Sequence, residues 1–413
     1  MEKPTVKILA AVMVAAFLAA STPPRASAAE RPRRRAAAAA APSPEVLAQI
    51  HVFGDRPAPF ALDARAAMLI DARTGAVLYA YNEHQRMQPA SLAKIMTFYL
   101  TLDAMAAKKI ALDTEIPISE AAWRLSMNDT VSRMFLGVGQ KVAVRDLLYG
   151  LMVSSGNDAA VALAEYLGGS SEAFTVQMNA KAQELGLTDT HFANPDGLPV
   201  EGEYTTAADM VKLARDLIQK HKEAITYTSA KDFTFDKINQ RNFNTLLFYD
   251  HRVNGIKTGH VDEAGFHLVA SAESNGMDLL SAVMGTPNAE KRRTETEKLI
   301  DWAFRTFVSV KPDWRKSVPP VVAVYEGVAN TVAIAPAGDS YVTLGRGEEN
   351  RVTLAYTPKA GQLVGPVAKG TEAGELAVLL DGKPEATLPV VTQAEVARAG
   401  IFKRLRDRIR MAL

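Results

Sequence analysis

Ser91 and Lys94 are the two residues whose types and spacing point most directly to chemistry. They lie in the stretch S-L-A-K, so on a helix their side chains share one face. A serine hydroxyl becomes a good nucleophile when a base takes its proton. A lysine amine can be that base if burial lowers its pKa, and residues 92–100 around Lys94 are almost wholly apolar. The pair predicts a nucleophile with its own base, although alone it also fits a serine that caps a helix beside a solvent-facing lysine.

A second pattern, S-G-N, places Ser155 and Asn157 on either side of Gly156. It separates two apolar stretches with helical spacing, Leu147–Met152 and Val161–Leu167. A glycine permits a tight turn, so both side chains can face a cleft. A hydroxyl can pass a proton to a leaving amine, and an amide can hold a peptide by its donor and its acceptor. Alone, this pattern is also typical of an ordinary turn between helices.

The third pattern is K-T-G, Lys257 to Gly259, at the end of a predicted strand. Lys257 and Thr258 offer a positive charge and a hydroxyl to a carboxylate. Gly259 lets an extended substrate approach the strand closely. Alone, it also fits a strand that ends in a turn. The three patterns each occur once, and together they form the motif set of penicillin-binding proteins and serine β-lactamases.

The residues around these motifs resemble low-molecular-mass penicillin-binding proteins of the 5/6 type, which are D-alanyl-D-alanine carboxypeptidases of the cell wall. The resemblance covers roughly residues 66–413. Six stretches carry it: P-A-S-L-A-K-I-M-T, L-M-V-S-S-G-N-D-A-A, H-F-A-N-P-D-G-L, F-T-F at Phe233–Phe235, N-G-I-K-T-G-H and S-A-V-M-G at Ser281–Gly285.

The resemblance implies a reaction in which Ser91 attacks the carbonyl between the two terminal D-alanines of a peptidoglycan stem pentapeptide. Lys94 takes the serine proton, Ser155 passes a proton to the leaving D-alanine, and water hydrolyses the acyl-enzyme. β-Lactams, which resemble the D-Ala-D-Ala end, are expected to acylate Ser91. No metal or other cofactor is implied.

The resemblance also implies a set of substrate-binding residues: Asn157, Lys257, Thr258, Gly259, His260 and Arg292. The backbone N–H groups of Ser91 and His260 would form the oxyanion hole. Thr258 and Arg292 would bind the terminal carboxylate, and Lys257 would supply positive potential. The chain departs from its relatives at Val261, where threonine is common, and so lacks a hydroxyl near that carboxylate.

The hydrophobic pattern predicts helices and antiparallel strands, an α+β fold, for residues 61–309, and the resemblance implies that this is a penicillin-binding or serine β-lactamase-like domain. We expect a hairpin over 68–81, antiparallel strands at 253–258, 266–270 and 279–284, a helix from Ser91 and another over 295–307. Short apolar stretches separated by Gly and Pro then predict a small all-β sandwich over 310–393.

The two ends of the chain differ in composition from the domains between them. Residues 1–28 have the charged start, short apolar run and A-S-A site of a signal peptide. Residues 29–60 are predicted to be a low-complexity tether, or alternatively an Arg-rich contact with the cell envelope. Residues 394–413 are predicted to form a basic amphipathic helix, in which Glu395 and Asp407 offset only two of six cations and the dense basic face has no obvious acidic partner nearby.

Such a helix favours attachment to an anionic membrane, although it could also pack on its own domain. We therefore expect a periplasmic protein held peripherally at the outer face of the inner membrane.

Composition excludes several other classes. There are 47 Lys and Arg against 46 Asp and Glu, so no global positive field favours nucleic acid. With no cysteine, the chain has no disulfide, thiolate metal site or cysteine nucleophile. It has neither the H-E-x-x-H pattern of metallohydrolases nor, between Ser155 and Lys257, the E-x-x-L-N segment of class A β-lactamases. A D,D-endopeptidase and a non-catalytic wall-binding protein remain open alternatives.

Overall fold

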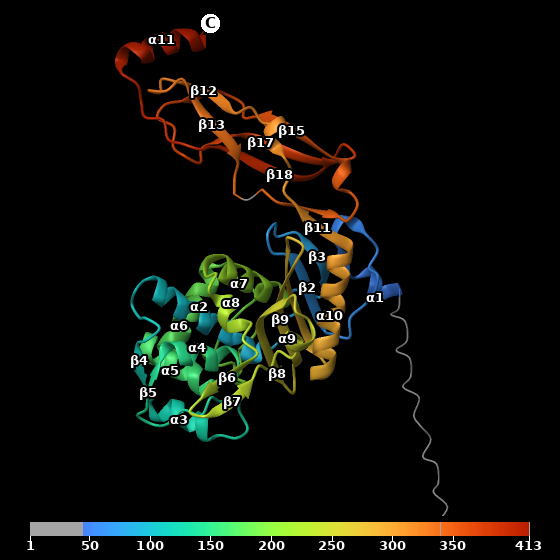
Figure 1. Ribbon diagram of the computed structural model, residues 1–413, viewed down its shortest axis with the longest axis vertical. Helices are drawn as coiled ribbons and strands as arrows, with labels where there is room; N and C mark the ends of the chain where they lie inside the picture. Colours follow the sequence, from blue (N-terminus) through green and yellow to red (C-terminus); the bar gives the residue numbers. More distant parts are fainter. Residues whose placement is uncertain (1–43, 339, 413) are drawn as a thin grey trace, which may run out of the picture. The chain divides into compact units, whose positions relative to one another are not determined.

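An antiparallel six-stranded sheet forms the centre of the first domain (Figure 1). The computed structural model describes residues 44–338 and 340–412. The strands neighbour one another in the order β1, β3, β2, β10, β9 and β8. Their bounds are β1 His51–Val52, β2 Ala66–Asp71, β3 Val77–Tyr81, β8 Val253–Val261, β9 Gly265–Ser274 and β10 Met277–Thr286. The predicted hairpin and the three later strands are confirmed, and each of those three is longer than expected.

Hydrophobic cores lie on both faces of this sheet, because alternate side chains of a strand point to opposite faces. On β2, Leu69 packs in one core with Leu299 and Ile300 of α10, Ala289–Thr306. Ile70 packs in the second core, which most of the other helices of this domain share. Burial of one such side chain contributes about 1.5–3 kcal/mol, so the sheet is a stable platform for the loops at its edge.

The helical layer on the second core carries the nucleophile motif. Ser91 lies in a 3₁₀ turn, Ala90–Ala93, which runs directly into α2, Lys94–Ala106. The predicted helix from Ser91 is therefore present, with a tighter first turn. The other helices of the domain are α1 Pro44–Ala48, α3 Glu120–Met127, α4 Val144–Met152, α5 Asn157–Gly168, α6 Ser171–Glu184, α7 Ala207–Lys220, α8 Ala224–Thr228 and α9 Leu246–Tyr249. Two short antiparallel pairs complete it: β4 Glu115–Pro117 with β5 Lys141–Ala143, and β6 Asp232–Phe235 with β7 Ile238–Arg241.

The helix α10 begins earlier than the predicted start at Glu295. Asn288 caps it, since its side chain accepts a hydrogen bond from the Lys291 backbone N–H at 2.8 Å. The first turn is rich in charged residues, so apolar periodicity did not reveal it. The earlier start places Arg292 on the helix.

The second domain is built from β-strands, as the sequence predicted. Six strands pair in the order β15, β17, β18, β13, β12 and β16. The ribbon of β11 and β14 packs against this sheet through Val342, Leu344 and Val378. The bounds are β11 Phe307–Val310, β12 Val321–Tyr325, β13 Thr331–Pro336, β14 Val342–Gly345, β15 Val352–Pro358, β16 Leu363–Val364, β17 Glu372–Leu380 and β18 Lys383–Thr392.

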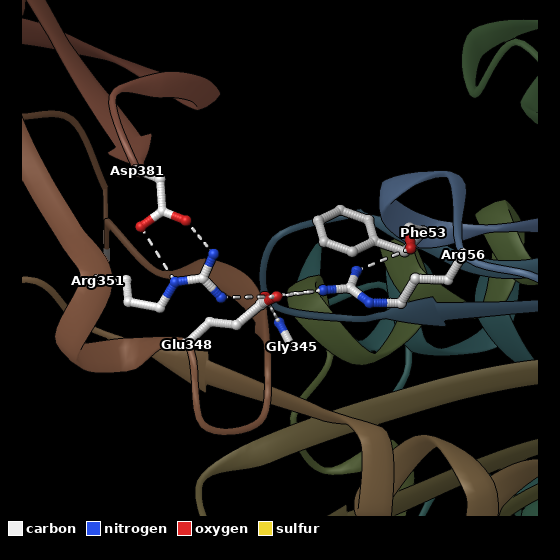
Figure 2. Close-up of polar contacts among 6 residues, drawn as sticks. All are labelled: Phe53, Arg56, Gly345, Glu348, Arg351 and Asp381. Atoms are coloured by element: carbon white, nitrogen blue, oxygen red, sulfur yellow. Dashed lines mark hydrogen bonds and ion pairs between the residues drawn. The ribbon is translucent and has the colours of Figure 1, made fainter.

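An acidic side chain links the two domains, as Figure 2 shows. Glu348 follows β14, and each of its carboxylate oxygens accepts a hydrogen bond of 2.8 Å from Arg56 Nη2. One oxygen also accepts the Gly345 backbone N–H at 2.8 Å. Arg351 lies 3.8 Å from the same carboxylate and pairs with Asp381. The segment before β2 therefore helps to hold the second domain.

This contact corrects one sequence-based boundary. The signal peptide at 1–28 and the first part of the predicted tether lie outside the described residues. The prediction of a low-complexity tether is wrong for residues 44–60. β1 pairs with β3, and Ile50 and Val52 are buried against the sheet. A few apolar residues at the end of a low-complexity stretch were enough to add an edge strand.

The C-terminal helix α11, Ile401–Ala412, turns an apolar face to solvent. Ile401, Phe402, Leu405 and Ile409 are between 57% and 89% exposed. Among the described residues, no helix is long and apolar enough to span a bilayer.

The basic face of α11 does have acidic partners, contrary to expectation. Glu326, far away in the sequence, pairs with Arg408 at 2.7 Å and lies 3.7 Å from both Arg398 and Arg404. Asp407 is buried and accepts the Glu326 backbone N–H at 3.0 Å. Pairing between residues so far apart cannot be predicted from the sequence near the helix. These ion pairs also determine which side of α11 faces solvent.

Candidate active site

Ser91 and Lys94 meet as the helical spacing predicted. The Lys94 Nζ donates a hydrogen bond to Ser91 Oγ at 3.1 Å. Ala90, immediately before the serine, has a φ of 49°, a conformation that costs a residue with a side chain about 1–2 kcal/mol. This strained turn presents the hydroxyl at the start of α2, where Ser91 lines a cleft together with residues of the other two motifs.

The Lys94 ammonium group is completely buried. It donates to Asn157 Oδ1 and to the Asp196 carbonyl oxygen, both at 2.5 Å. Burial lowers the pKa of Lys94 to about 8, although Asp196, Asp158 and Glu203, when ionised, act to raise it. Near neutral pH the amine is therefore poised to exchange a proton, as a general base requires.

Ser155 and Lys257 form a second hydroxyl–amine pair in the same cleft. Lys257 Nζ donates to Ser155 Oγ at 2.9 Å and to the Thr258 carbonyl at 3.0 Å. Burial, together with the positive charges of Lys94 and Arg292, holds the pKa of Lys257 well below its usual value. Ser155 has a φ of 57°, so backbone strain accompanies both serines.

The remaining predicted residues line one cleft of about 370 Å³. Thr258 and Gly259 lie on β8, His260 stacks on Phe266 with ring centroids 3.8 Å apart, and Arg292 reaches in from α10. Arg292 Nη2 donates to the Phe243 carbonyl at 3.1 Å, and burial lowers the pKa of Arg292 to about 10. All the predicted residues therefore line the cleft except Lys94 and Lys257, which are buried. The complete lining of the cleft is Ser91, Thr130, Val131, Ser132, Ser155, Asn157, Asp196, Gly197, Leu198, Pro199, Phe243, Thr258, Gly259, His260, Val261, Phe266, Ala289 and Arg292.

Comparisons with known proteins agree with this geometry. Residues 54–288 match the family described as D-alanyl-D-alanine carboxypeptidase, and residues 315–398 match the C-terminal domain of penicillin-binding protein 5. The chain belongs to the D-alanyl-D-alanine carboxypeptidase family. It is thus a serine peptidase of the penicillin-binding protein type.

Individual relatives of this carboxypeptidase are similar over most of its length. D-alanyl-D-alanine carboxypeptidase DacA of Haemophilus influenzae is 38% identical over 84% of this chain and 89% of its own. DacC of Escherichia coli is 38% identical over 85% of this chain and 88% of its own.

Two solved structures are also similar to it. The crystal structure of penicillin-binding protein 5 from H. influenzae covers 83% of this chain and all of its own, with a TM-score of 0.76 and 38% identity. Penicillin-binding protein D2 from Listeria monocytogenes, in its cefotaxime-bound form, covers 60% of this chain and all of its own, with 32% identity and a TM-score of 0.55.

The structure adds a loop to which sequence reasoning gave no role in the carboxypeptidase. Asp196 contributes the carbonyl that accepts from Lys94, and Gly197 lines the cleft next to it. Asn194 Oδ1 fixes this turn by accepting the backbone N–H groups of Asp196 at 3.2 Å and Gly197 at 2.5 Å. The stretch N-P-D-G is a turn pattern, but only the fold shows that the turn touches the base.

Two of the predicted substrate contacts have a further structural task. Asn157 Oδ1 is occupied by Lys94, which leaves its amide N–H₂ group for a substrate. On Gly259, a Cβ would lie 2.9 Å from the Pro89 carbonyl, so this glycine is also required for packing β8 against the nucleophile turn. Among the described residues no group of His, Asp and Glu is placed to hold a metal ion.

Proposed function

We propose that this carboxypeptidase removes the terminal D-alanine from peptidoglycan stem pentapeptides through an acyl-enzyme on Ser91. The observation that carries the proposal is the contact of 3.1 Å between Ser91 Oγ and the wholly buried amine of Lys94. The neutral amine takes the hydroxyl proton as Oγ attacks the carbonyl carbon of the penultimate residue. The peptide bond then breaks, and the D-alanine amine leaves with a proton.

Ser155 is suited to deliver that proton. Its hydroxyl lines the cleft and accepts a hydrogen bond from Lys257 at 2.9 Å. The backbone N–H groups of Ser91 and His260 are proposed to stabilise the developing oxyanion. A water molecule then attacks the ester, which returns the proton to Ser91 and releases the shortened peptide.

The positive end of the cleft fits a substrate with a free carboxylate. Arg292 brings a guanidinium group to the cleft and Thr258 lines the same cleft with a hydroxyl, while Lys257 is buried beside Thr258. A terminal carboxylate gains charge-assisted hydrogen bonds there. We propose that Thr258 and Arg292 bind it and that the free N–H₂ group of Asn157 holds the substrate amide.

β-Lactams are proposed to inhibit the enzyme by acylating the same serine. The Listeria neighbour, which is 32% identical and covers 60% of this chain, was solved in a cefotaxime-bound form. A ring-opened β-lactam would remain as an ester on Ser91.

Intact-mass spectrometry after incubation with penicillin tests the nucleophile and the chemistry together. The expected result is one adduct of the full drug mass, located on the peptide that contains Ser91. Ser91→Ala should give no adduct while its thermal unfolding stays the same. A Ser91→Ala protein that still gains the drug mass would disprove the assignment. Release of D-alanine from a synthetic pentapeptide, measured on the same two proteins, tests the substrate.

We further propose a periplasmic location with peripheral attachment to the inner membrane. The support is the exposed apolar face of α11, which carries no membrane-spanning stretch but can enter the interface between head groups and acyl chains. Secretion would depend on the signal peptide predicted at residues 1–28. Fractionation of cells that produce the full chain tests both points, because the enzyme should sediment with membranes and be released by high salt or detergent.

A further inference from the structure

A carboxyl group lies buried near Lys94 without a hydrogen-bond partner. Glu203 is only 5% exposed, and neither of its carboxylate oxygens makes a hydrogen bond with a described residue. Buried polar groups nearly always have such a partner, because leaving one unpaired costs about 1–3 kcal/mol. The proposed mechanism gives this residue no task, so its presence in the interior calls for an explanation.

Glu203 belongs to the loop that supplies a ligand to the Lys94 amine. The loop closes where His191 and Tyr204 exchange backbone hydrogen bonds of 2.8 and 3.1 Å. The Tyr204 ring packs under the Arg86 guanidinium at the surface. Because alternate side chains of an extended segment point in opposite directions, Glu203 faces inward together with the fully buried Thr205.

The inner side of this loop also carries the charges that act on the base. Asp196 offers its carbonyl oxygen to Lys94 at 2.5 Å, and its own carboxyl is buried. Among the described residues, the groups whose charges act on Glu203 are Asp196, from the same loop, and Lys94, from α2. Lys94 is also acted on by Asp158 of α5.

Asp158 and Glu203 differ in their hydrogen bonds. The Asp158 carboxyl group accepts hydrogen bonds from the Ser126 hydroxyl at 2.6 Å and from the backbone N–H groups of Met134 and Ala159. Near Glu203, only the Ala193 peptide, among the described residues, acts on the carboxyl group in this way. Burial raises the pKa of Glu203 to about 8; Asp196 adds to the rise, and the Ala193 peptide and Lys94 oppose it. Glu203 is therefore a neutral acid at pH 7.

We propose that Glu203 is a positioning residue whose protonation state sets that of the catalytic amine of Lys94. While its carboxyl keeps its proton, no extra negative charge stabilises the Lys94 ammonium form, and the amine is free to accept the Ser91 proton. When the carboxyl ionises, the ammonium form becomes more stable and the base is lost to a larger fraction of molecules. The inference depends on the proposed role of Lys94 as the base.

The test compares Glu203→Gln with Glu201→Gln, an exposed neighbour in the same loop. Glutamine imitates the neutral acid at every pH. We therefore measure the rate of acylation by penicillin by stopped-flow from pH 6 to 10. The increase of this rate with pH should begin at a lower pH in Glu203→Gln than in the wild type. We expect its midpoint to fall by about 0.3–0.5 unit, which increases the rate at pH 8 by about 1.3- to 1.5-fold. Glu201→Gln should follow the wild type.

Three results would overturn the inference. These are a Glu203→Gln profile that overlays the wild type, a slower rate at every pH, or a defect confined to hydrolysis of the acyl-enzyme. If Glu203→Gln does not fold, carbon-13 NMR of the wild type decides instead. A Glu203 carboxyl that titrates near pH 8, together with the Lys94 Cε signal, supports the inference, and titration below pH 6 refutes it. Failure of the proposed function is separate, because the wild type would then form no penicillin adduct at all.

Discussion

Gly197 lies directly against the carbonyl group of Ala90. A Cβ atom on Gly197 would lie 1.8 Å from the Ala90 oxygen and 3.1 Å from the Ser91 nitrogen. No side chain fits in that space, so the loop that contacts Lys94 also supports the turn that presents the nucleophile. The position of Ser91 thus depends on a residue that takes no part in the chemistry.

Gly197→Ala should therefore inactivate the enzyme by moving the nucleophile. The φ of Gly197 is 75°, which alone costs an alanine roughly 1–2 kcal/mol, and the clash with Ala90 adds to that cost. We expect acylation by fluorescent penicillin to slow by at least about 100-fold, since small misplacements of reacting groups have effects of this size. Gly202→Ala is the matched control, because its φ is 84° but nothing lies within 4 Å of the added Cβ. Equal loss in both variants would show that backbone strain, not displacement of Ser91, is responsible.

Ser155→Ala should slow acylation by a factor of about 100 or more, because the proton relay to the leaving group is lost. The neighbouring Ser154 is a suitable control. Its hydroxyl donates to the Gly150 carbonyl at 2.8 Å, within its own helix turn, and does not line the cleft. Ser154→Ala should retain the wild-type rate in the same stopped-flow assay. If Ser155→Ala acylates normally, the proton reaches the leaving group by another route.

The rate of acylation should follow the ionisation of Lys94. Because burial lowers the pKa of Lys94 to about 8, the neutral amine is a minor form at pH 7 and the dominant form above pH 8. The rate should thus increase about tenfold per unit at low pH and level off above about pH 8.5. Lys94→Ala should remove this rise and reduce the plateau by orders of magnitude. A wild-type rate that is flat between pH 6 and 9 would contradict the assignment of the base.

Sequence patterns predicted most of this site because its chemistry depends on local spacing. Ser91 and Lys94 are brought together by one helical turn, so their contact follows from the sequence alone. The meeting of Ser155 with Lys257 depends on the fold, and only the order of the motifs and the resemblance to a family predicted it. The apolar periodicity of the strands placed the sheet that brings the motifs together.

The residues that were missed act through the backbone or through distant partners. Asp196 accepts a hydrogen bond from Lys94 through its backbone carbonyl group. Every residue has such a group, so the residue type at position 196 did not indicate this contact. Gly197 is one glycine among many. Glu326 contacts the basic face of α11 from another part of the second domain. Because this partner is distant in the sequence, the sequence near the helix gave the impression that its cations had no acidic partner.

Glu348→Ala should weaken the junction of the two domains without affecting catalysis. Both oxygens of Glu348 contact Arg56, and this geometry makes a partly buried pair worth about 1 kcal/mol. A second polar junction remains, since buried Asp71 accepts the Thr343 hydroxyl at 2.8 Å. We expect a fall of a few degrees in the melting temperature and an unchanged rate of penicillin acylation. Glu385→Ala, on the exposed side of β18, should leave both unchanged. A large loss of acylation in Glu348→Ala would instead show that the second domain supports the catalytic cleft.

The exposed apolar face of α11 should determine binding to anionic vesicles. Phe402 and Leu405 are 89% and 61% exposed, and each gains about 1.5–3 kcal/mol on full transfer from water. Replacing both by Asp should reduce co-sedimentation with phosphatidylglycerol vesicles at least about tenfold, and deletion of residues 400–413 should abolish it. The rate of penicillin acylation should not change in either variant, because α11 is far from the cleft in sequence and lines no part of it.

Glu326→Gln is the informative comparison, since it keeps the apolar face but loses the ion pairs with Arg408, Arg404 and Arg398. If the pairs only orient the helix, this variant will still bind vesicles. If vesicle binding is as strong in the double Asp variant as in the wild type, the apolar face is not the anchor.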